Sequence, residues 1–206
     1  RVPDSPEGEP QERWKSGMNR EALATMDEVL SLPMREGVAV DGGAHIGRWT
    51  QAMAGRFSKV LAFEPESETA ALLLVNTLHL PNVRMYKKAL VWTCGHKVGL
   101  QWRLPRRSDT ARLNATGPKV DTTTLDAECA AHPIAFMKLD LEGFEYHALR
   151  GGEQTLLRCK PLVLIEEKDG MSEFYGVPTG TARQWLESIG MQIVKRFHID
   201  VLMGWP

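Results

Sequence analysis

A short stretch near the start of the chain, residues 38–47, constrains the fold more than any other part of the sequence. It reads Val-Ala-Val-Asp-Gly-Gly-Ala-His-Ile-Gly. The apolar residues 38–40 indicate a short buried strand, which Asp41 closes. Three glycines follow, and residues 49–57 have the pattern of a helix. Because glycines let the backbone approach a ligand closely and a helix N-terminus offers unpaired N–H groups, this unit predicts a nucleotide-binding site.

A second acidic residue supports the same prediction. Glu64 lies 23 positions after Asp41, at the end of the apolar run 60–63. An acid at the tip of the second strand of a βαβ unit is placed to accept hydrogen bonds from ribose hydroxyls.

The glycine spacing indicates which ligand the turn binds. A dinucleotide fingerprint needs Gly-x-Gly-x-x-Gly or Gly-x-Gly-x-x-Ala. Counted from Gly42 the third position is Ala44, and counted from Gly43 it is His45. Asp41 precedes the glycines, where it would repel a pyrophosphate and attract a cation. The sequence therefore favours S-adenosylmethionine, which has a cationic amino group and no phosphate. An ordinary strand-to-helix turn without a ligand is the alternative.

Length and composition limit the fold class and the location. A chain of 206 residues fits one domain, and its net charge of −1 gives no overall attraction to nucleic acid or acidic membranes. Cys94, Cys129 and Cys159 form no Cys-x-x-Cys pair, so we expect a reducing, cytoplasmic location without disulfides or zinc. No apolar run approaches the ~18 residues of a membrane span. We expect a leader and helix over residues 1–36 and one domain over 37–206.

Strands and helices alternate along much of the chain. We expect a third strand over residues 83–91, a fourth over 135–140 followed by a helix over 145–157, and a fifth over 161–166. The last apolar runs, within 191–205, indicate a terminal antiparallel hairpin. The alternation predicts an α/β fold, a parallel sheet with helices on both faces, whose ligands bind at the carboxyl ends of the strands.

This alternation is interrupted by a hairpin insertion, expected near residues 95–125. Residues 95–104 alternate between apolar and polar, which predicts a half-exposed strand, and residues 119–125 would be the returning strand. Arg103 near the end of the first strand, and Arg106 and Arg107 after it, form a basic run. Such a basic run is usually a solvated face, but arginine forks also bind phosphate or carboxylate groups of a substrate. Both interpretations are kept.

Several short motifs, taken together, resemble one known family. They are Asp41–Gly47, Phe63-Glu64-Pro65, Asn76, Thr124-Leu125-Asp126, Lys138-Leu-Asp140-Leu-Glu142-Gly143, and Pro161 leading to Ile165-Glu166. Over about residues 37–206 the chain resembles the FkbM-type class I S-adenosylmethionine-dependent methyltransferases. The resemblance implies a Rossmann-like, mostly parallel, seven-stranded sheet with an antiparallel last strand. It also implies O-methylation of a hydroxyl, often on a sugar or another small molecule. Two positions depart from the family pattern: His45, where Asn is frequent, and Gly42, where Val or Ile is common.

The resemblance also implies where the cofactor binds. The turn would hold the methionine part and Glu64 the ribose. The cofactor-binding residues expected are Asp41, Gly42, Gly43, Ala44, His45, Gly47, Glu64, Pro65 and Asp140.

Three polar residues, two in the last part of the fourth strand and one just beyond it, are candidates for catalysis. Asp140 ends that strand and is the first candidate for the base that removes the acceptor proton. Glu142 either shares the acceptor hydroxyl or caps the following helix, and Lys138 is either a catalytic partner of Asp140 or part of a buried ion pair. Glu166, at the end of the fifth strand, either reaches the substrate or forms a plain salt bridge. We expect no metal, because hard cations need more oxygen ligands than this set offers.

Three functions are compatible with the sequence. The leading one is an O-methyltransferase acting on a small molecule or glycan. The second is a nucleic-acid methyltransferase that uses the arginine cluster and Trp102, although the near-neutral charge disfavours it. The third is a non-catalytic cofactor-binding module. A homo-oligomer is compatible with each.

Overall fold

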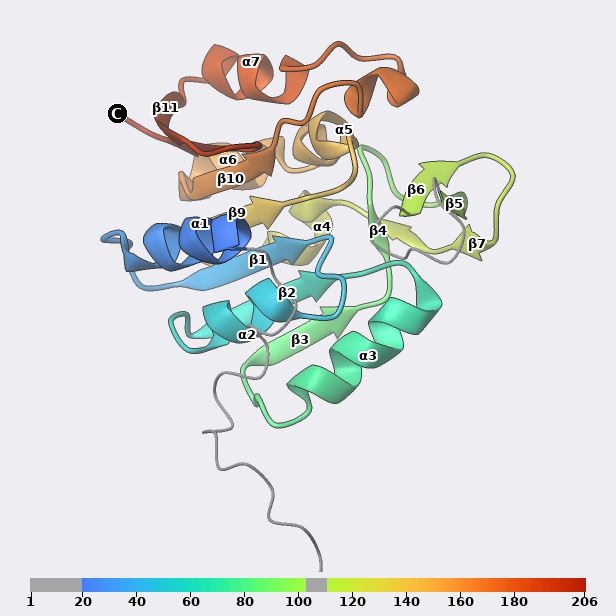
Figure 1. Cartoon of the computed structure of the whole chain (residues 1–206), viewed down its shortest axis with the longest axis horizontal. Helices are drawn as coiled ribbons and strands as arrows, with labels where there is room; N and C mark the ends of the chain where they lie inside the picture. The colour runs from blue at the N-terminus through green and yellow to red at the C-terminus, as the bar shows by residue number, and fades with distance from the viewer. Residues whose placement is uncertain (1–19, 103–110) are drawn as a thin grey trace, which may run out of the picture.

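A seven-stranded sheet organises the chain, as Figure 1 shows. The computed structural model describes residues 20–102 and 111–206. In order across the sheet, the strands are β11 (Gln192–Arg196), β12 (Asp200–Gly204), β10 (Leu162–Glu166), β9 (Ile134–Leu139), β1 (Val38–Gly42), β2 (Lys59–Phe63) and β3 (Val83–Tyr86). Strand β12 is antiparallel to both of its neighbours, and the other paired strands are parallel. The predicted fold class, mostly parallel with an antiparallel C-terminal strand, is confirmed.

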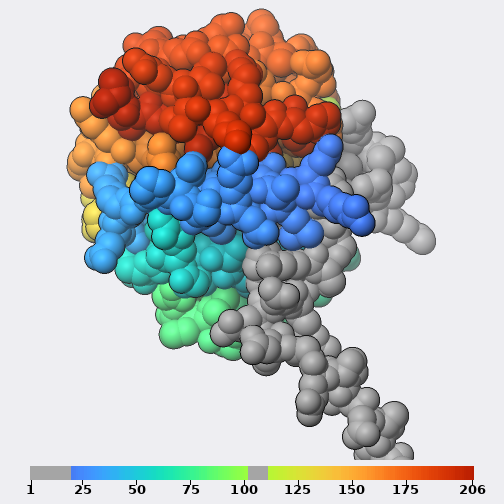
Figure 2. Space-filling model, turned by 60° about the vertical axis from the view of Figure 1, so that its left-hand side comes forward, coloured from blue at the N-terminus to red at the C-terminus, as the bar shows by residue number. Residues whose placement is uncertain are grey.

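Helices cover both faces of this sheet (Figure 1). One face carries α1 (Arg20–Ser31), α2 (Arg48–Ala54) and α3 (Ser67–Thr77), and the other carries α4 (Leu125–Cys129), α5 (Glu145–Arg150), α6 (Glu153–Cys159) and α7 (Thr181–Ser188). All six residues of β9 are buried, as expected for a central strand covered on both sides. In Figure 2, α1 lies as a blue band between the C-terminal segments and the region of α2.

The third strand is shorter than the sequence predicted. Its pairing with β2 ends at Tyr86, because Tyr86 lies opposite Phe63, the last residue of β2. After Glu64 the chain leaves the sheet and leads into α3. Residues 89–90 then form a separate strand, β4 (Ala89–Leu90), which pairs in parallel with β8 (Thr122–Thr123). The single strand expected over residues 83–91 was therefore wrong in its second half.

The predicted hairpin is in fact a three-stranded ribbon. Its centre is β5 (Val98–Trp102), flanked on either side by the antiparallel strands β6 (Ala111–Asn114) and β7 (Lys119–Val120). The returning strand expected over residues 119–125 was wrong, since that segment divides among β7, β8 and the start of α4. The ribbon is fixed to the loop after β10 by the short 3-10 helix η3 (Ser172–Tyr175), because the Tyr175 hydroxyl accepts a hydrogen bond from the backbone N–H of Leu113 at 3.0 Å.

The helix expected over residues 145–157 is broken into α5 and α6 at Gly151 and Gly152. A Cβ on Gly151 would lie 2.2 Å from the Val91 carbonyl oxygen, so the pair of glycines lets this bend approach the β4 segment. The start of α6 is capped from far away in the sequence. The two carboxylate oxygens of Asp126 accept hydrogen bonds from the backbone N–H groups of Gln154 and Thr155, at 3.2 and 2.7 Å.

The turn between β1 and α2 depends on close backbone contacts. The N–H groups of Gly43 and Ala44 both donate to the Phe63 carbonyl oxygen at 3.0 Å, which holds the turn against the end of β2. Gly43 has a φ of 74°, and a Cβ there would lie 1.9 Å from the Asp140 carbonyl oxygen. The Asn76 amide of α3 donates to the Ile46 carbonyl oxygen at 2.8 Å, so the turn is braced from outside as well.

Replacing Gly43 with alanine should test this close packing. We expect Gly43→Ala to lower the free energy of unfolding by about 2–5 kcal/mol, from the left-handed backbone and the overlap with Asp140 together. Gly170→Ala is the matched control, because Gly170 has a φ of 77° but no atom within 4 Å of an added Cβ. It should lose only about 1–2 kcal/mol. Equal losses in urea unfolding would contradict the packing argument.

Removing the Asp126 carboxylate should leave two N–H groups of α6 without a partner. Asp126→Ala is expected to cost about 1–2 kcal/mol of unfolding free energy, as for the loss of a helix cap. Asp121→Ala is the control, since within the described part of the chain the Asp121 side chain pairs with the exposed Lys97 alone. Its cost should stay below about 1 kcal/mol. An Asp126→Ala variant as stable as the control would show that the cap contributes nothing.

Candidate functional site

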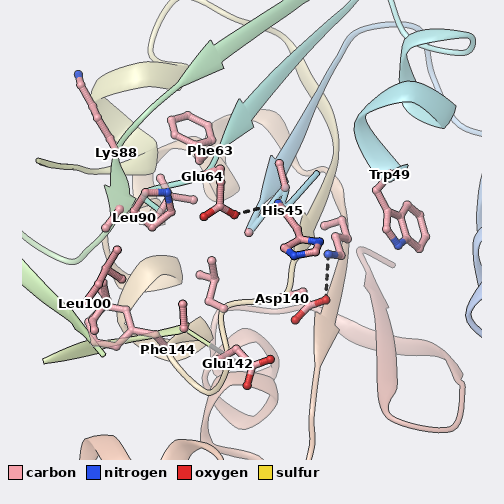
Figure 3. A pocket seen from close by; sticks show the side chains of 18 of the residues that line it. His45, Trp49, Phe63, Glu64, Lys88, Leu90, Leu100, Asp140, Glu142 and Phe144 are labelled. Atoms are coloured by element: carbon pink, nitrogen blue, oxygen red, sulfur yellow. Dashed lines mark hydrogen bonds and ion pairs between the residues drawn. The ribbon is translucent and has the colours of Figure 1, made fainter. Parts of the chain in front are cut away.

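A cavity of about 510 Å³ opens where the carboxyl ends of β1, β2 and β9 meet the ribbon (Figure 3). Its lining includes six of the residues expected to bind a cofactor: Gly43, Ala44, His45, Glu64, Pro65 and Asp140. The carboxyl ends of the parallel strands are where the sequence placed the ligand. The cavity therefore lies at the predicted edge of the sheet.

Glu64 joins the first two βα units at the floor of this cavity. Its side-chain oxygens accept hydrogen bonds from the backbone N–H groups of His45 and Glu66, each at 2.9 Å. Burial raises the pKa of the Glu64 carboxyl to about 6, although these two N–H donors act in the opposite direction. Each carboxylate oxygen keeps a second lone pair, so Glu64 can still accept hydrogen bonds from a ligand.

Asp41 lies beneath the turn and is fully buried. One oxygen accepts a hydrogen bond from the Thr50 hydroxyl at 2.6 Å, and the other, Oδ1, has no hydrogen-bond partner among the described residues. Burial raises the pKa of Asp41. Asp41, Gly42 and Gly47 do not line the cavity. Gly47 instead precedes α2 with a φ of 90° and faces Leu73 of α3.

Lys138 and Asp140 form an ion pair on the β9 side of the cavity. The Lys138 ammonium lies 3.1 Å from the Asp140 carboxylate, and both residues line the cavity. The Lys138 side chain is 7% exposed and that of Asp140 is 40% exposed, so the pair extends from the interior to the open space. Burial opposes the charge of Lys138, but Asp140 and Asp41 outweigh it and raise the pKa of the ammonium. The buried Lys138 ammonium therefore holds the Asp140 carboxylate at the cavity surface.

Glu142 also lines the cavity, in a left-handed conformation with a φ of 54°. The alternative that Glu142 caps the next helix is not what the structure shows. The first residue of α5, Glu145, instead braces the loop before the helix, since one oxygen of its side chain accepts hydrogen bonds from the backbone N–H groups of Leu141 and Gly143 at 2.7 and 3.3 Å. Burial raises the pKa of Glu145 to about 7.

None of the residues expected to contact the substrate is seen to line the main cavity. Glu166 does not line the main cavity but a small adjoining pocket, and burial together with Asp140 and Glu145 raises its pKa to about 9. Arg103, Arg106 and Arg107 lie outside the described residues. Among residues 20–102 and 111–206, no group of three His, Cys, Asp or Glu side chains is placed to hold a metal ion. The same ranges contain no helix long and apolar enough to cross a membrane.

Sequence reasoning missed much of the lining. The further lining residues are Ala22, Arg48, Trp49, Phe63, Lys88, Ala89, Leu90, Leu100, Ala111, Leu113, Leu141 and Phe144. Trp49 lies in the first turn of the helix after the glycines, with its ring 6.0 Å from the Lys138 ammonium, and its position next to the turn was the available signal. Leu100 and Leu113 come from the ribbon, and their approach to the cavity depends on tertiary structure.

Comparisons with known proteins agree with the architecture. A model of the methyltransferase FkbM domain matches residues 41–193. A search of curated proteins found no match. The solved structures with similar folds include a methyltransferase FkbM from Methylobacillus flagellatus, at 18% identity and a TM-score of 0.55. That alignment covers 84% of this chain but 44% of the other, so this chain spans less than half the length of that relative.

Two further solved structures match over nearly the whole of both chains. A precorrin-8w decarboxylase from Methanobacterium thermoautotrophicum is 15% identical with a TM-score of 0.55, and the alignment covers 92% of each chain. A methyltransferase from Streptococcus mutans, described as putative and solved in complex with SAH, is 9% identical with a TM-score of 0.54, covering 91% of this chain and 98% of that one. At such identities the likeness concerns the fold. The family assignment comes from the domain match over more than half of the sequence: this chain belongs to the FkbM methyltransferase family.

Proposed function

We propose that this chain is an S-adenosylmethionine-dependent methyltransferase that methylates a hydroxyl of a sugar or another small molecule. The observation that carries the proposal is the convergence of the glycine turn, Glu64 and the Lys138–Asp140 pair on one cavity. Membership of the FkbM family supports methyl transfer. The similar fold solved with SAH, from Streptococcus mutans, supports this choice of cofactor.

The residues at the floor of the cavity fit this cofactor. The Gly43–Ala44 turn offers a surface without side-chain bulk, and Glu64 offers acceptor oxygens for ribose hydroxyls beside it. One oxygen of Asp41 has no hydrogen-bond partner in residues 20–102 and 111–206, and we propose that its negative charge beneath the turn favours a cationic ligand above it. Since Asp41 does not line the cavity, its proposed contribution is to this charge and to the shape of the turn through Thr50. When bound, S-adenosylmethionine supplies an electrophilic methyl group on a sulfonium.

The acceptor is proposed to bind on the β9 side. Asp140 would accept the hydrogen bond of the acceptor hydroxyl and take its proton as the oxygen is methylated, while Lys138 holds the carboxylate in place. Glu142 lies beside them and is proposed to orient the same hydroxyl. Positioning of the acceptor would supply much of the rate. Contacts of Glu166, Arg103, Arg106 and Arg107 with the acceptor remain predictions.

The acceptor class is supported by the mixed character of the lining. Polar groups that can recognise hydroxyls stand on the β9 side, and apolar side chains from β4, the ribbon and Phe144 stand opposite, as Figure 3 shows. A cavity with a few convergent polar groups and apolar walls is typical of small-molecule sites. A salt-sensitive gel shift with RNA or DNA would instead favour the nucleic-acid alternative.

Calorimetric titration tests the cofactor directly. The full chain should bind S-adenosylmethionine or its demethylated product, and should bind NAD more weakly or not at all. Tighter binding of NAD would overturn the proposal. Binding without methyl transfer to any member of a panel of sugars and small hydroxyl compounds would favour the non-catalytic module.

Glu64→Gln should weaken cofactor affinity about ten-fold or more, because hydrogen bonds to a charged group contribute roughly 1.5–3 kcal/mol. The pH dependence should change as well. Ribose hydroxyls stabilise the ionised carboxylate, so wild-type affinity should hold above the pKa of about 6 and fall as the pH drops below it. The Gln variant should lack this fall. Titrations of both proteins at several pH values check it, and a Gln variant with wild-type affinity would exclude Glu64 as a ligand.

Asp140→Asn should lower the turnover number by roughly 10²–10⁴-fold on the identified acceptor, as for the loss of a general base. Cofactor affinity should change little, because the Gly43–Ala44 turn and Glu64, which are proposed to hold the cofactor, keep their positions. Asp121→Asn, at an exposed ion pair, is the control and should keep full activity. An Asp140→Asn turnover number within about two-fold of wild type would show that Asp140 is only a structural strand end.

A further inference from the structure

The outer face of α3 is apolar, although it faces solvent. Leu72, Leu74, Val75 and Leu78 are 52%, 47%, 63% and 71% exposed, at the end of the helix and just beyond it. We call these four residues the α3 strip. A surface helix normally turns polar residues outward, and contiguous exposed apolar patches mark interaction sites. The α3 strip is therefore the surface feature that most needs an explanation.

The fold and the proposed reaction do not account for this strip. The core contacts of α3 are made by its other side, where Leu73 is fully buried and packs against Gly47. None of the four strip residues lines the cavity. Figure 1 shows α3 on the outside of the sheet beside the edge strand β3. The strip thus lies on an outer edge of the described fold.

The side chains at the two ends of the strip indicate what covers it. Glu68 is exposed in the first turn of α3, and His79 is exposed just after its last turn. Between them the strip carries no charge. If a second copy of α3 packs antiparallel, a two-fold axis that sets Glu68 opposite the second copy's His79 also sets Leu72 opposite the second copy's Val75. The same surface then sets an acidic side chain opposite an imidazole at each end and apolar side chains opposite one another between them, as a two-fold interface requires.

We propose that α3 is the face by which two copies of this chain associate, antiparallel, through Leu72, Val75 and Leu78, with Glu68 and His79 paired at each end. The contact buries apolar side chains without burying an unpaired charge. A single helix pair is a small interface, so the association is reversible and depends on protein concentration. This inference does not rest on the proposed methyl transfer.

The test begins with the mass of the full chain, measured by sedimentation velocity over about a hundred-fold range of concentration. Wild type should shift from monomer to dimer. Leu72→Asp places a carboxylate at the centre of the contact and should weaken association by about a hundred-fold or more. Leu157→Asp is the matched control, since Leu157 of α6 is also 47% exposed, like Leu74, but lies outside the strip. It should dimerise like wild type.

Charge reversal tests the antiparallel pairing without touching the apolar residues. Glu68→Lys should weaken association about two- to five-fold, as for an exposed ion pair. The double variant Glu68→Lys/His79→Glu should restore it, because the pair is rebuilt with the signs exchanged. Cofactor titration and thermal unfolding of every variant show whether the fold is retained, and wild-type values are expected.

Three results would overturn the proposal. One is a wild type that stays monomeric over the whole range, which would leave the strip to a different partner. Another is a dimer that persists in Leu72→Asp, which would place the interface elsewhere. The third is a double charge variant that dimerises no better than Glu68→Lys, which would exclude the antiparallel arrangement.

Discussion

The close approach of β1 to β9 at their carboxyl ends is the constraint on which the rest of the site depends. The Asp140 backbone N–H donates to the Gly42 carbonyl oxygen at 3.1 Å, and the Gly43 backbone lies against the Asp140 carbonyl group. No side chain fits between them. Because the turn and the Asp140 backbone are hydrogen-bonded directly, the proposed cofactor site and the Asp140 Cα are held at a fixed separation, and the Lys138 ammonium then holds the Asp140 carboxylate.

A row of three charged side chains runs from the interior beneath the turn to the cavity surface. Lys138 lies between the fully buried Asp41 and the partly exposed Asp140, and both carboxylates stabilise its charge. Removing either acid would leave a buried cation only partly compensated, which costs more than an exposed ion pair contributes. The Lys-x-Asp motif therefore has a structural reason: the buried ion pair, one of the two alternatives that the sequence left open, is present, and the catalytic role stays a prediction.

Sequence patterns predicted the elements that are determined by residues close together in the chain. They did not predict the features that depend on contacts between distant segments. The strand, the glycine turn and Glu64 were predicted because spacing alone reports a βαβ unit. The break after Tyr86 was missed because it depends on where the partner strand β2 ends. The division of the helix at Gly151 depends on contact with Val91, and the cap of α6 comes from Asp126, far back in the chain. The burial of Asp41 was missed for the same reason, since a strand end does not reveal which side chains face the cavity.

The attachment of the ribbon has a consequence for how such a protein diversifies. Leu100 and Leu113 form one wall of the cavity, yet the ribbon pairs within itself and is tied to the η3 segment by the Tyr175 hydroxyl. The turn, Glu64 and Asp140 take their positions from the main sheet instead. In the proposed reaction, inherited changes in ribbon sequence would alter which molecules the wall admits and leave the turn, Glu64 and Asp140 in place. Selection and reaction would then evolve on separate parts of the fold.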